Sequence, residues 1–189
     1  MKTIFALIFC LISSPVFAFG PAIQAVLTST PAAAGGSGWF GTTGDPGASD
    51  DAGTASVICG QIGTPTCTGT CNVSKIALYH SSAGGGDIAF GIYTNPSGVP
   101  VAIVGTETRF PGGVVSLDWH EYNVDYTLTC GTSYYLCLNS EGDNTWKYEA
   151  ANNRYYYKSN AYADAWPSTL SDLTGPINAT ISIKAYYTW

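Results

Sequence analysis

The sequence predicts an all-β protein built as a two-sheet antiparallel β-sandwich, jelly-roll-like in type. Short segments with alternating apolar and polar residues recur along the chain, and period-two alternation indicates half-buried strands. Turn residues separate these segments, including 22 Gly and 10 Pro, and Met1 is the single methionine of a chain poor in helix formers. A chain of 189 residues is long enough for one sizeable domain.

The first 18 residues predict a cleaved signal peptide. Lys2 precedes an apolar run from Ile4 to Ile12, and "VFA" ends at Ala18. A charge, a short apolar run and a small residue at the cleavage point are typical of secretory signals. The run is too short to span a bilayer. We therefore expect a secreted protein, extracellular or at a cell surface, without membrane insertion.

Residues 19–38 predict an N-terminal strand and a flexible linker before a sandwich domain at 39–189. The segment "AIQAVLTST" is β-prone and precedes an Ala/Gly-rich stretch. It can be a loose terminus or the first strand of the domain's own sheet. It can also be a donor strand, residues 22–30, that adds to a neighbouring molecule's sheet edge and gives self-association.

The next strands follow in order, beginning with one near Ser56–Ile62. The segment "NVSKIALYHS" alternates clearly, so its side chains divide between two faces. The two sets are Val73, Lys75, Ala77 and Tyr79 on one face, and Ile76, Leu78 and His80 on the other. After a glycine turn at 84–86, "DIAFGIYTN" places Ile88, Phe90 and Ile92 on one face.

A turn at "NPSGVP" follows, in which Pro96 fixes φ and Gly98 can take a positive φ. The remaining predicted strands are "VAIVGTETRF", "VVSLDWHEYNV", "YTLT", "SYYLCLNS", "TWKYEA", "RYYYKS" and "NATISIKAYYT". Eight or more short strands separated by turns are typical of a sandwich or jelly roll.

The stretch "LTCGTSYYL", residues 128–136, resembles a tyrosine corner. In that motif a phenol hydrogen-bonds to backbone a few residues upstream, where the chain crosses between sheets. We expect Tyr134 to face inward with Leu136 and Leu138, and Tyr135 and Cys137 to take the other face with Asn139. The alternative is an ordinary hairpin.

Five cysteines follow the signal peptide, so at least one is free or pairs between molecules. They are Cys59, Cys67, Cys71, Cys130 and Cys137. Two bridges allow fifteen connectivities. Short loops favour one bridge within residues 59–71 and another between Cys130 and Cys137. A zinc site is disfavoured, because neither histidine lies at ligand spacing and an exported chain favours disulfides.

The negative net charge argues against two classes of partner. The formal net charge is −6, which gives no electrostatic hold on nucleic acid or anionic lipid.

The order of several motifs resembles β-sandwich modules of secreted bacterial and phage-associated proteins. The motifs are "VSKIALYHSSAGGGDIAFGIYTNPSGVP", "LTCGTSYYLCL", "RYYYKSNAYADAWP" and "ATISIKAYYT". The resemblance covers about residues 40–188 and implies a fold similar to carbohydrate-binding and cell-surface modules. It implies no catalytic motif, and the cysteines depart from the usual pattern.

Catalysis is not the favoured reading. Only His80 and His120 could serve as an imidazole base, and no GxSxG elbow is present. Glycoside hydrolysis needs two convergent carboxylates, but Asp118 and Glu121 are an odd number of positions apart in one strand and should face opposite ways.

Sugar binding has the stronger basis. Exposed aromatic rings give a large contact area with few rotors to immobilise. In "RYYYK", Arg154, Tyr156 and Lys158 share one face, and their charged ends predict that this face is exposed while Tyr155 and Tyr157 point inward. By the same logic Trp146 and Tyr148 point inward. The predicted ligand site is Tyr156, Tyr162, Trp166, Arg154, Asn160 and Asp164.

Trp166 has an alternative role as a plug at the end of the core. No cofactor is predicted, although a structural Ca²⁺ is possible in the acidic loop "DPGASDD", with Asp45, Asp50 and Asp51 as candidate ligands.

The sequence thus predicts a secreted, non-catalytic module that binds a polysaccharide or cell-surface glycan. The alternatives are a structural subunit of an extracellular filament or appendage assembled by exchange of an N-terminal strand and, less favoured, a secreted glycan hydrolase.

Overall fold

The computed structural model describes residues 35–42, 45–52, 56–82, 86–112, 117–141, 144–150 and 154–189, without the side chains of 51 and 52. These residues belong to one compact unit, Gly35–Trp189. The predicted signal peptide and the predicted donor strand lie outside the described residues.

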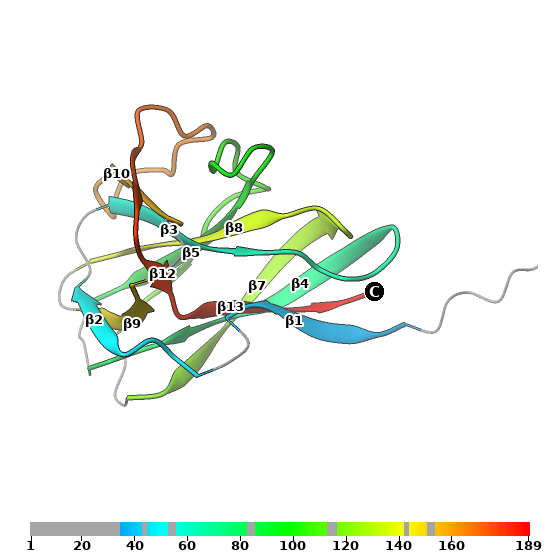
Figure 1. Cartoon of the computed structure of the whole chain (residues 1–189), viewed down its shortest axis with the longest axis horizontal. Helices are drawn as coiled ribbons and strands as arrows, with labels where there is room; N and C mark the ends of the chain where they lie inside the picture. The colour runs from blue at the N-terminus through cyan, green and yellow to red at the C-terminus, as the bar shows by residue number, and fades with distance from the viewer. Residues whose placement is uncertain are drawn as a thin grey trace, which may run out of the picture. The chain divides into compact units, whose positions relative to one another are not determined.

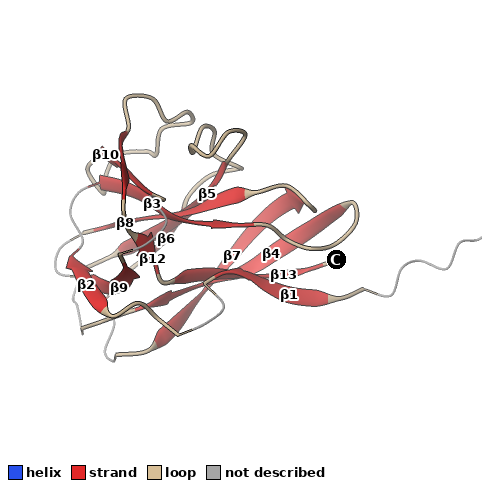
Figure 2. Ribbon diagram, viewed as in Figure 1, coloured by secondary structure: helices blue, strands red, loops and turns tan. Residues whose placement is uncertain are grey.

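The described chain forms thirteen strands, and Figure 2 shows no helix among them. They are β1 (Ser37–Gly41), β2 (Ser49–Ala52), β3 (Ser56–Gly63), β4 (Thr70–Tyr79), β5 (Ile88–Thr94), β6 (Thr108–Phe110), β7 (Trp119–Thr129), β8 (Tyr134–Ser140), β9 (Thr145–Glu149), β10 (Tyr155–Ser159), β11 (Thr174–Ile177), β12 (Thr180–Ile181) and β13 (Ile183–Thr188). Within these residues, no helical segment has the length and apolar character of a membrane span.

Two main sheets make the sandwich (Figure 1). One has four strands in the order β1-β13-β4-β7, and the other has six in the order β11-β10-β3-β8-β5-β6. A small third sheet, β12-β9-β2, was not predicted. Every strand pair is antiparallel. The predicted all-β sandwich is confirmed.

Apolar side chains at every second strand position form the inner core between the two main sheets. Ile76 and Leu78 of β4 meet Ile88, Phe90 and Ile92 of β5 there. The inner core also contains Leu128, Tyr134, Leu136, Leu138, Trp146, Ile183 and Tyr187. Burying each large apolar side chain stabilises the fold by about 1.5–3 kcal/mol before chain entropy is counted.

The tyrosine corner is confirmed. The backbone N–H of Thr129 donates to the Tyr134 hydroxyl at 3.0 Å, and Gly131 between them takes a φ of 74° that favours glycine. Tyr134, Leu136 and Leu138 face the inner core as predicted.

The predicted position of Val73 was wrong. A register shift lies between Val73 and Lys75 of β4, where β4 pairs with β7. The extra residue returns Val73 to the face of Ile76 and Leu78, and it is fully buried. Lys75, Ala77 and Tyr79 remain on the opposite face as predicted.

A second hydrophobic layer covers the other face of the six-stranded sheet. This outer core consists of Val57, Cys59, Ala89, Tyr93, Tyr135, Cys137, Tyr156, Trp166 and Leu170. Its cover is formed by the loops before β6 and after β10, which lie side by side in Figure 1, green and orange. The N–H of Ile103 donates to the carbonyl of Ser168 at 3.1 Å, and that of Leu170 to Val101 at 2.7 Å. The central strands of this sheet, β3, β8 and β5, are thus buried on both faces.

Several strand boundaries differ from the predictions. Of "VAIVGTETRF" only Thr108–Phe110 is a strand, because residues 101–104 pair with β5 only through an isolated bridge between Tyr93 and Ile103. Strand β7 begins at Trp119, within "VVSLDWHEYNV", and runs on through "YTLT" without a break. Strand β1 begins at Ser37, inside the predicted linker, and β2 lies in the predicted acidic loop.

The predicted local disulfides were wrong. Cys59 pairs with Cys137, 78 residues away, and Cys67 pairs with Cys130, 63 residues away. Cys59 and Cys137 are register partners on β3 and β8, so sheet pairing brings them together. Cys71 is the free cysteine of the described residues, and it is buried.

Candidate functional site

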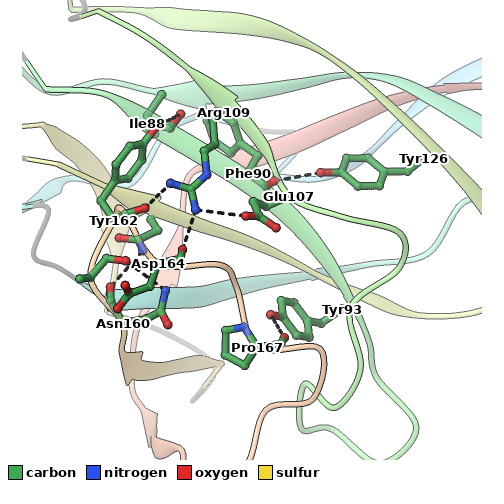
Figure 3. A network of polar contacts seen from close by, with 12 residues as sticks. Ile88, Phe90, Tyr93, Glu107, Arg109, Tyr126, Asn160, Tyr162, Asp164 and Pro167 are labelled. Atoms are coloured by element: carbon green, nitrogen blue, oxygen red, sulfur yellow. Dashed lines mark hydrogen bonds and ion pairs between the residues drawn. The ribbon is translucent and has the colours of Figure 1, made fainter.

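The loop after β10 carries four of the six predicted ligand residues, and hydrogen bonds hold it against the outer core. The Arg109 guanidinium donates to the carbonyl oxygens of Tyr162 and Asp164 and pairs with Glu107 at 3.1 Å (Figure 3). It also lies 5.0 Å from the centre of the Tyr162 ring. The Asn139 amide donates to the Asn160 carbonyl at 3.1 Å. The loop therefore acts as a structural cover.

Trp166 does not present an exposed ring. It is 6% exposed and stacks on Tyr93, with ring centres 6.2 Å apart. The Tyr93 hydroxyl donates to the Pro167 carbonyl at 2.7 Å. A Cβ atom on Gly91 would lie 2.5 Å from the Trp166 ring, so glycine is required for this contact. Trp166 is therefore buried, but in the outer core and not at the end of the core between the two main sheets.

The predicted exposure of Tyr156 was also wrong. Tyr156 is 8% exposed and packs edge-on against Tyr135 in the outer core. The charged ends of "RYYYK" suggested an exposed face, but Lys158 reaches over the layer and donates to the Ser171 carbonyl at 2.9 Å. Tyr156 and Trp166 are thus buried in the outer core, against which Tyr162 packs, and Arg154 lines a polar cleft.

A different set of tyrosines forms a concave site, the tyrosine cleft. Tyr148 of β9 and Tyr155 and Tyr157 of β10 line it together with Ile177 and Ala179, and its volume is about 250 Å³. Tyr155 and Tyr157 share one face of β10 as predicted, and their rings are 6.3 Å apart at 66°. Both pack only partly against the inner core, so their remaining surface is available to the cleft.

The edge of the six-stranded sheet shapes the tyrosine cleft. Tyr155 pairs with Ile177 and Tyr157 with Thr174, with a register shift between the two pairs. Such an irregularity re-aims side chains at a sheet edge. Ile177 is 43% exposed, so the cleft opens beside an apolar rim.

A second, polar cleft lies close to the first. Arg154, Glu149 and Asp45 line it, and its volume is about 130 Å³. The other lining residues are Thr42, Gly47, Gln61, Thr180 and Ser182. Tyr148 and Glu149 are neighbours in β9, and neighbouring strand residues point to opposite faces. The two clefts thus flank the same strand.

The candidate calcium ligands do not converge in the part of the chain that is described. Asp50 pairs with Lys147 at 2.8 Å, and hydrogen bonds from Lys147 and then Ser81 lower the pKa of its carboxyl. Asp45 lies in the polar cleft, and the side chain of Asp51 is outside the description. Among the described residues, the cluster of three potential metal ligands is Cys67, Cys71 and Cys130.

An exposed aromatic face lies on the four-stranded sheet. The Lys184 ammonium is 4.8 Å from the ring centre of Trp39 and 4.1 Å from that of Trp119. Tyr186 packs on Trp39 and Tyr79 on Trp119. These rings are half-buried, and Lys75 and Glu121 form an ion pair at 2.6 Å on the same sheet.

Sequence reasoning missed both aromatic surfaces. Trp119 and Tyr79 are register partners, as are Trp39 and Tyr186, but pairing between distant strands is not readable from one sequence. Alternation within "WHEYNV" was the available signal for Trp119, since it places Trp119 and Glu121 on the face opposite His120 and Tyr122.

His80 is buried as a neutral imidazole. It is 0% exposed, and its Nε2 is 2.8 Å from the Tyr122 hydroxyl. Burial, and then the nearby His120, lower its pKa to about 4. His80 therefore has the character of a structural core residue.

We expect stability to fall as pH drops below 6.5. Above pH 6.5 His80 is neutral in both states. Between pH 6.5 and about 4 the unfolded chain takes up a proton at His80 that the folded chain does not. This difference lowers the free energy of unfolding by about 3 kcal/mol at pH 4. Titration of the His80 ring protons by NMR measures this directly. A midpoint between pH 6 and 7 would contradict the prediction.

Comparisons with known proteins identify the fold only. No family model matches the sequence, and no curated protein matches it. Among solved structures the chain is similar to the clostridial cysteine protease Cwp84 after propeptide cleavage, with a TM-score of 0.51 and 14% identity. The match covers 80% of this chain and 40% of that chain, so this chain spans less than half of that protein. At this identity the likeness supports the all-β fold alone.

Proposed function

We propose that this protein is a secreted, non-catalytic module that binds a polysaccharide or cell-surface glycan in the tyrosine cleft. The observation that carries the proposal is the convergence of Tyr148, Tyr155 and Tyr157 on one cleft of about 250 Å³. Binding pockets are typically concave and largely apolar, with a few polar groups that fix orientation.

Tyrosine suits sugar chemistry for two reasons. Its ring offers a flat apolar surface to the C–H face of a pyranose, and its hydroxyl donates and accepts hydrogen bonds. Little entropy is lost on binding, because a tyrosine side chain has only two main rotors and these three are already partly packed. The cleft is slightly smaller than the roughly 300–1,000 Å³ of drug-sized pockets, which favours one or two sugar rings.

Two features support secretion and a binding role. Two disulfides are typical of proteins in an oxidising, extracellular compartment. The polar cleft adds Arg154, Glu149 and Asp45 beside the tyrosines, and these groups can hydrogen-bond to sugar hydroxyls at the cleft's margin.

The test is a broad glycan-binding screen of residues 19–189, followed by affinity measurements on variants. Tyr157→Leu keeps apolar volume but removes the flat ring surface, and we expect roughly two- to tenfold weaker glycan binding, since an aromatic contact contributes about 0.5–1.5 kcal/mol. Tyr157→Phe keeps the ring and should retain most of the affinity. Melting temperatures of all variants establish that each remains folded.

A matched control separates the tyrosine cleft from the other surfaces. Tyr162→Leu alters a half-buried tyrosine of the cover loop, and Trp119→Leu alters the aromatic face. Both variants should bind the glycan with the affinity of the wild type. Loss of binding in Trp119→Leu alone would move the site to the four-stranded sheet.

Native mass and product analysis on the same sample test the other functions. High-mass species that disappear when residues 22–30 are deleted would favour a filament subunit. Release of new reducing ends from the bound glycan would favour a hydrolase. We expect a monomer or small oligomer and no turnover.

A further inference from the structure

Three cysteine sulfurs meet where β4 begins and β7 ends. Cys67 and Cys130 form a disulfide, and Cys71 is a free thiol that is 3% exposed. The three Sγ atoms all lie within 4.8 Å of one another. A thiol therefore faces both sulfurs of an existing disulfide from within the fold.

We propose that Cys67, Cys71 and Cys130 form an internal thiol–disulfide exchange site, which can deliver a reactive thiol to the protein surface. The Cys71 thiolate attacks Sγ of Cys67 or Cys130, and a new S–S bond forms as the Cys67–Cys130 bond breaks. The displaced sulfur leaves with the electron pair of the broken bond and takes up the proton that Cys71 released. One disulfide and one thiol are present before and after, so no external oxidant or reductant is required.

The exchange changes where the free thiol lies. Cys71 is buried, whereas Cys67 and Cys130 are half-buried. The neighbours of Cys67, Thr66 and Thr68, are exposed, as is Gly131 next to Cys130. Exchange therefore carries the thiol from the core to positions that an electrophile or an external disulfide can reach. Cys67 and Cys130 are in this sense a latent modification site.

The surrounding backbone holds the cluster together independently of which sulfurs are bonded. The N–H of Cys130 donates to the Gly69 carbonyl at 2.9 Å, and that of Gly131 to the Pro65 carbonyl at 2.9 Å. The Tyr187 hydroxyl accepts a bond from the N–H of Thr66 at 2.9 Å. The first two bonds join the loop before β4 to the end of β7, and the third joins that loop to β13, so either alternative disulfide would close within the same local fold.

The other disulfide takes no part. Cys59 and Cys137 are buried in the outer core on β3 and β8, and the three-cysteine cluster is at the start of β4. Burial raises the pKa of the Cys71 thiol. Because the thiolate is the attacking species, exchange should become faster as pH rises above neutrality.

Serine variants test whether Cys71 can reach each partner. Residues 19–189 contain five cysteines, and the wild type should show one free thiol after denaturation without reductant. Cys67→Ser and Cys130→Ser should each show none, because Cys71 pairs with the remaining partner. Two free thiols in both variants would overturn the proposal. Cys59→Ser is the matched control and should show two, since Cys71 and Cys137 lie in separate layers.

Labelling of the native wild type tests the exchange itself. The folded protein is incubated with N-ethylmaleimide, and labelled peptides are mapped by mass spectrometry without reduction. We expect label at Cys67 or Cys130, with a rate that increases at least fivefold between pH 7 and pH 8.5. In Cys71→Ser neither position should be labelled. Label confined to Cys71 of the wild type at every pH would contradict the proposal, and the wild-type result does not depend on the folding of a variant.

Discussion

Replacing both Cys59 and Cys137 with alanine is expected to lower the free energy of unfolding by roughly 4–5 kcal/mol. The bond joins residues 78 positions apart, and in the chain-entropy model a loop of that length gives a stabilisation of about this size. Both sulfurs are also buried in the outer core, so the substitution loses packing as well. Equilibrium unfolding in urea, with the double variant beside the wild type, gives the difference.

The double replacement of Cys67 and Cys130 is the matched comparison. Its loop of 63 residues is similar in length, but both cysteines are half-buried, so we expect a somewhat smaller loss. A change below about 1 kcal/mol for the Cys59 and Cys137 pair would show that this bond does not constrain the chain as the fold requires.

Trp166→Ala is expected to lower the free energy of unfolding by about 3–5 kcal/mol, the usual range when a buried tryptophan is truncated. The ring stacks on Tyr93 and packs against the backbone of Gly91, so the truncation removes both contacts. Chemical denaturation monitored by fluorescence measures the loss.

Trp119→Ala provides the control for Trp166. Trp119 is half-buried on the aromatic face, so its truncation should lower the free energy of unfolding clearly less than Trp166→Ala does. If Trp166→Ala instead leaves stability unchanged but abolishes glycan binding, then the ring serves a ligand and the cover-loop interpretation is wrong.

The fold class was predictable because apolar residues recur at every second position along the strands, as Ile88, Phe90 and Ile92 do in β5, and these residues reach the inner core. The predicted strands near Ser56–Ile62, at "DIAFGIYTN" and at "SYYLCLNS" correspond to β3, β5 and β8. The tyrosine corner was predictable for a local reason, since Tyr134 and its backbone partner Thr129 are five residues apart. Both signals lie within a single short segment.

The second buried layer was not predictable by the same rule. Alternation assigns one face of a strand to solvent, and the Lys and Arg residues in "RYYYK" seemed to mark that face. In the six-stranded sheet both faces are covered, and Lys158 reaches past the layer to a backbone carbonyl. A long charged side chain can lie over apolar surface while its end stays polar, so Tyr156 is buried beside it.

Long-range pairing explains the other errors. Cys59 pairs with Cys137 because β3 and β8 are neighbours in one sheet, and Cys67 meets Cys130 because they flank β4 and β7, which are neighbours in the other. The tyrosine cleft likewise depends on β9, β10 and β11, whose arrangement follows from the topology of two sheets. The residue types at the candidate site were visible in the sequence, but their convergence was not.

Glycan binding in the tyrosine cleft is tested by an NMR titration of the folded protein, with tyrosine rings labelled, against a glycan found in the screen. We expect the ring signals of Tyr148, Tyr155 and Tyr157 to shift together and saturate at one dissociation constant, while those of Tyr93 and Tyr162 stay in place. Shifts confined to Tyr162, or to the rings of Tyr79 and Tyr186, would contradict it.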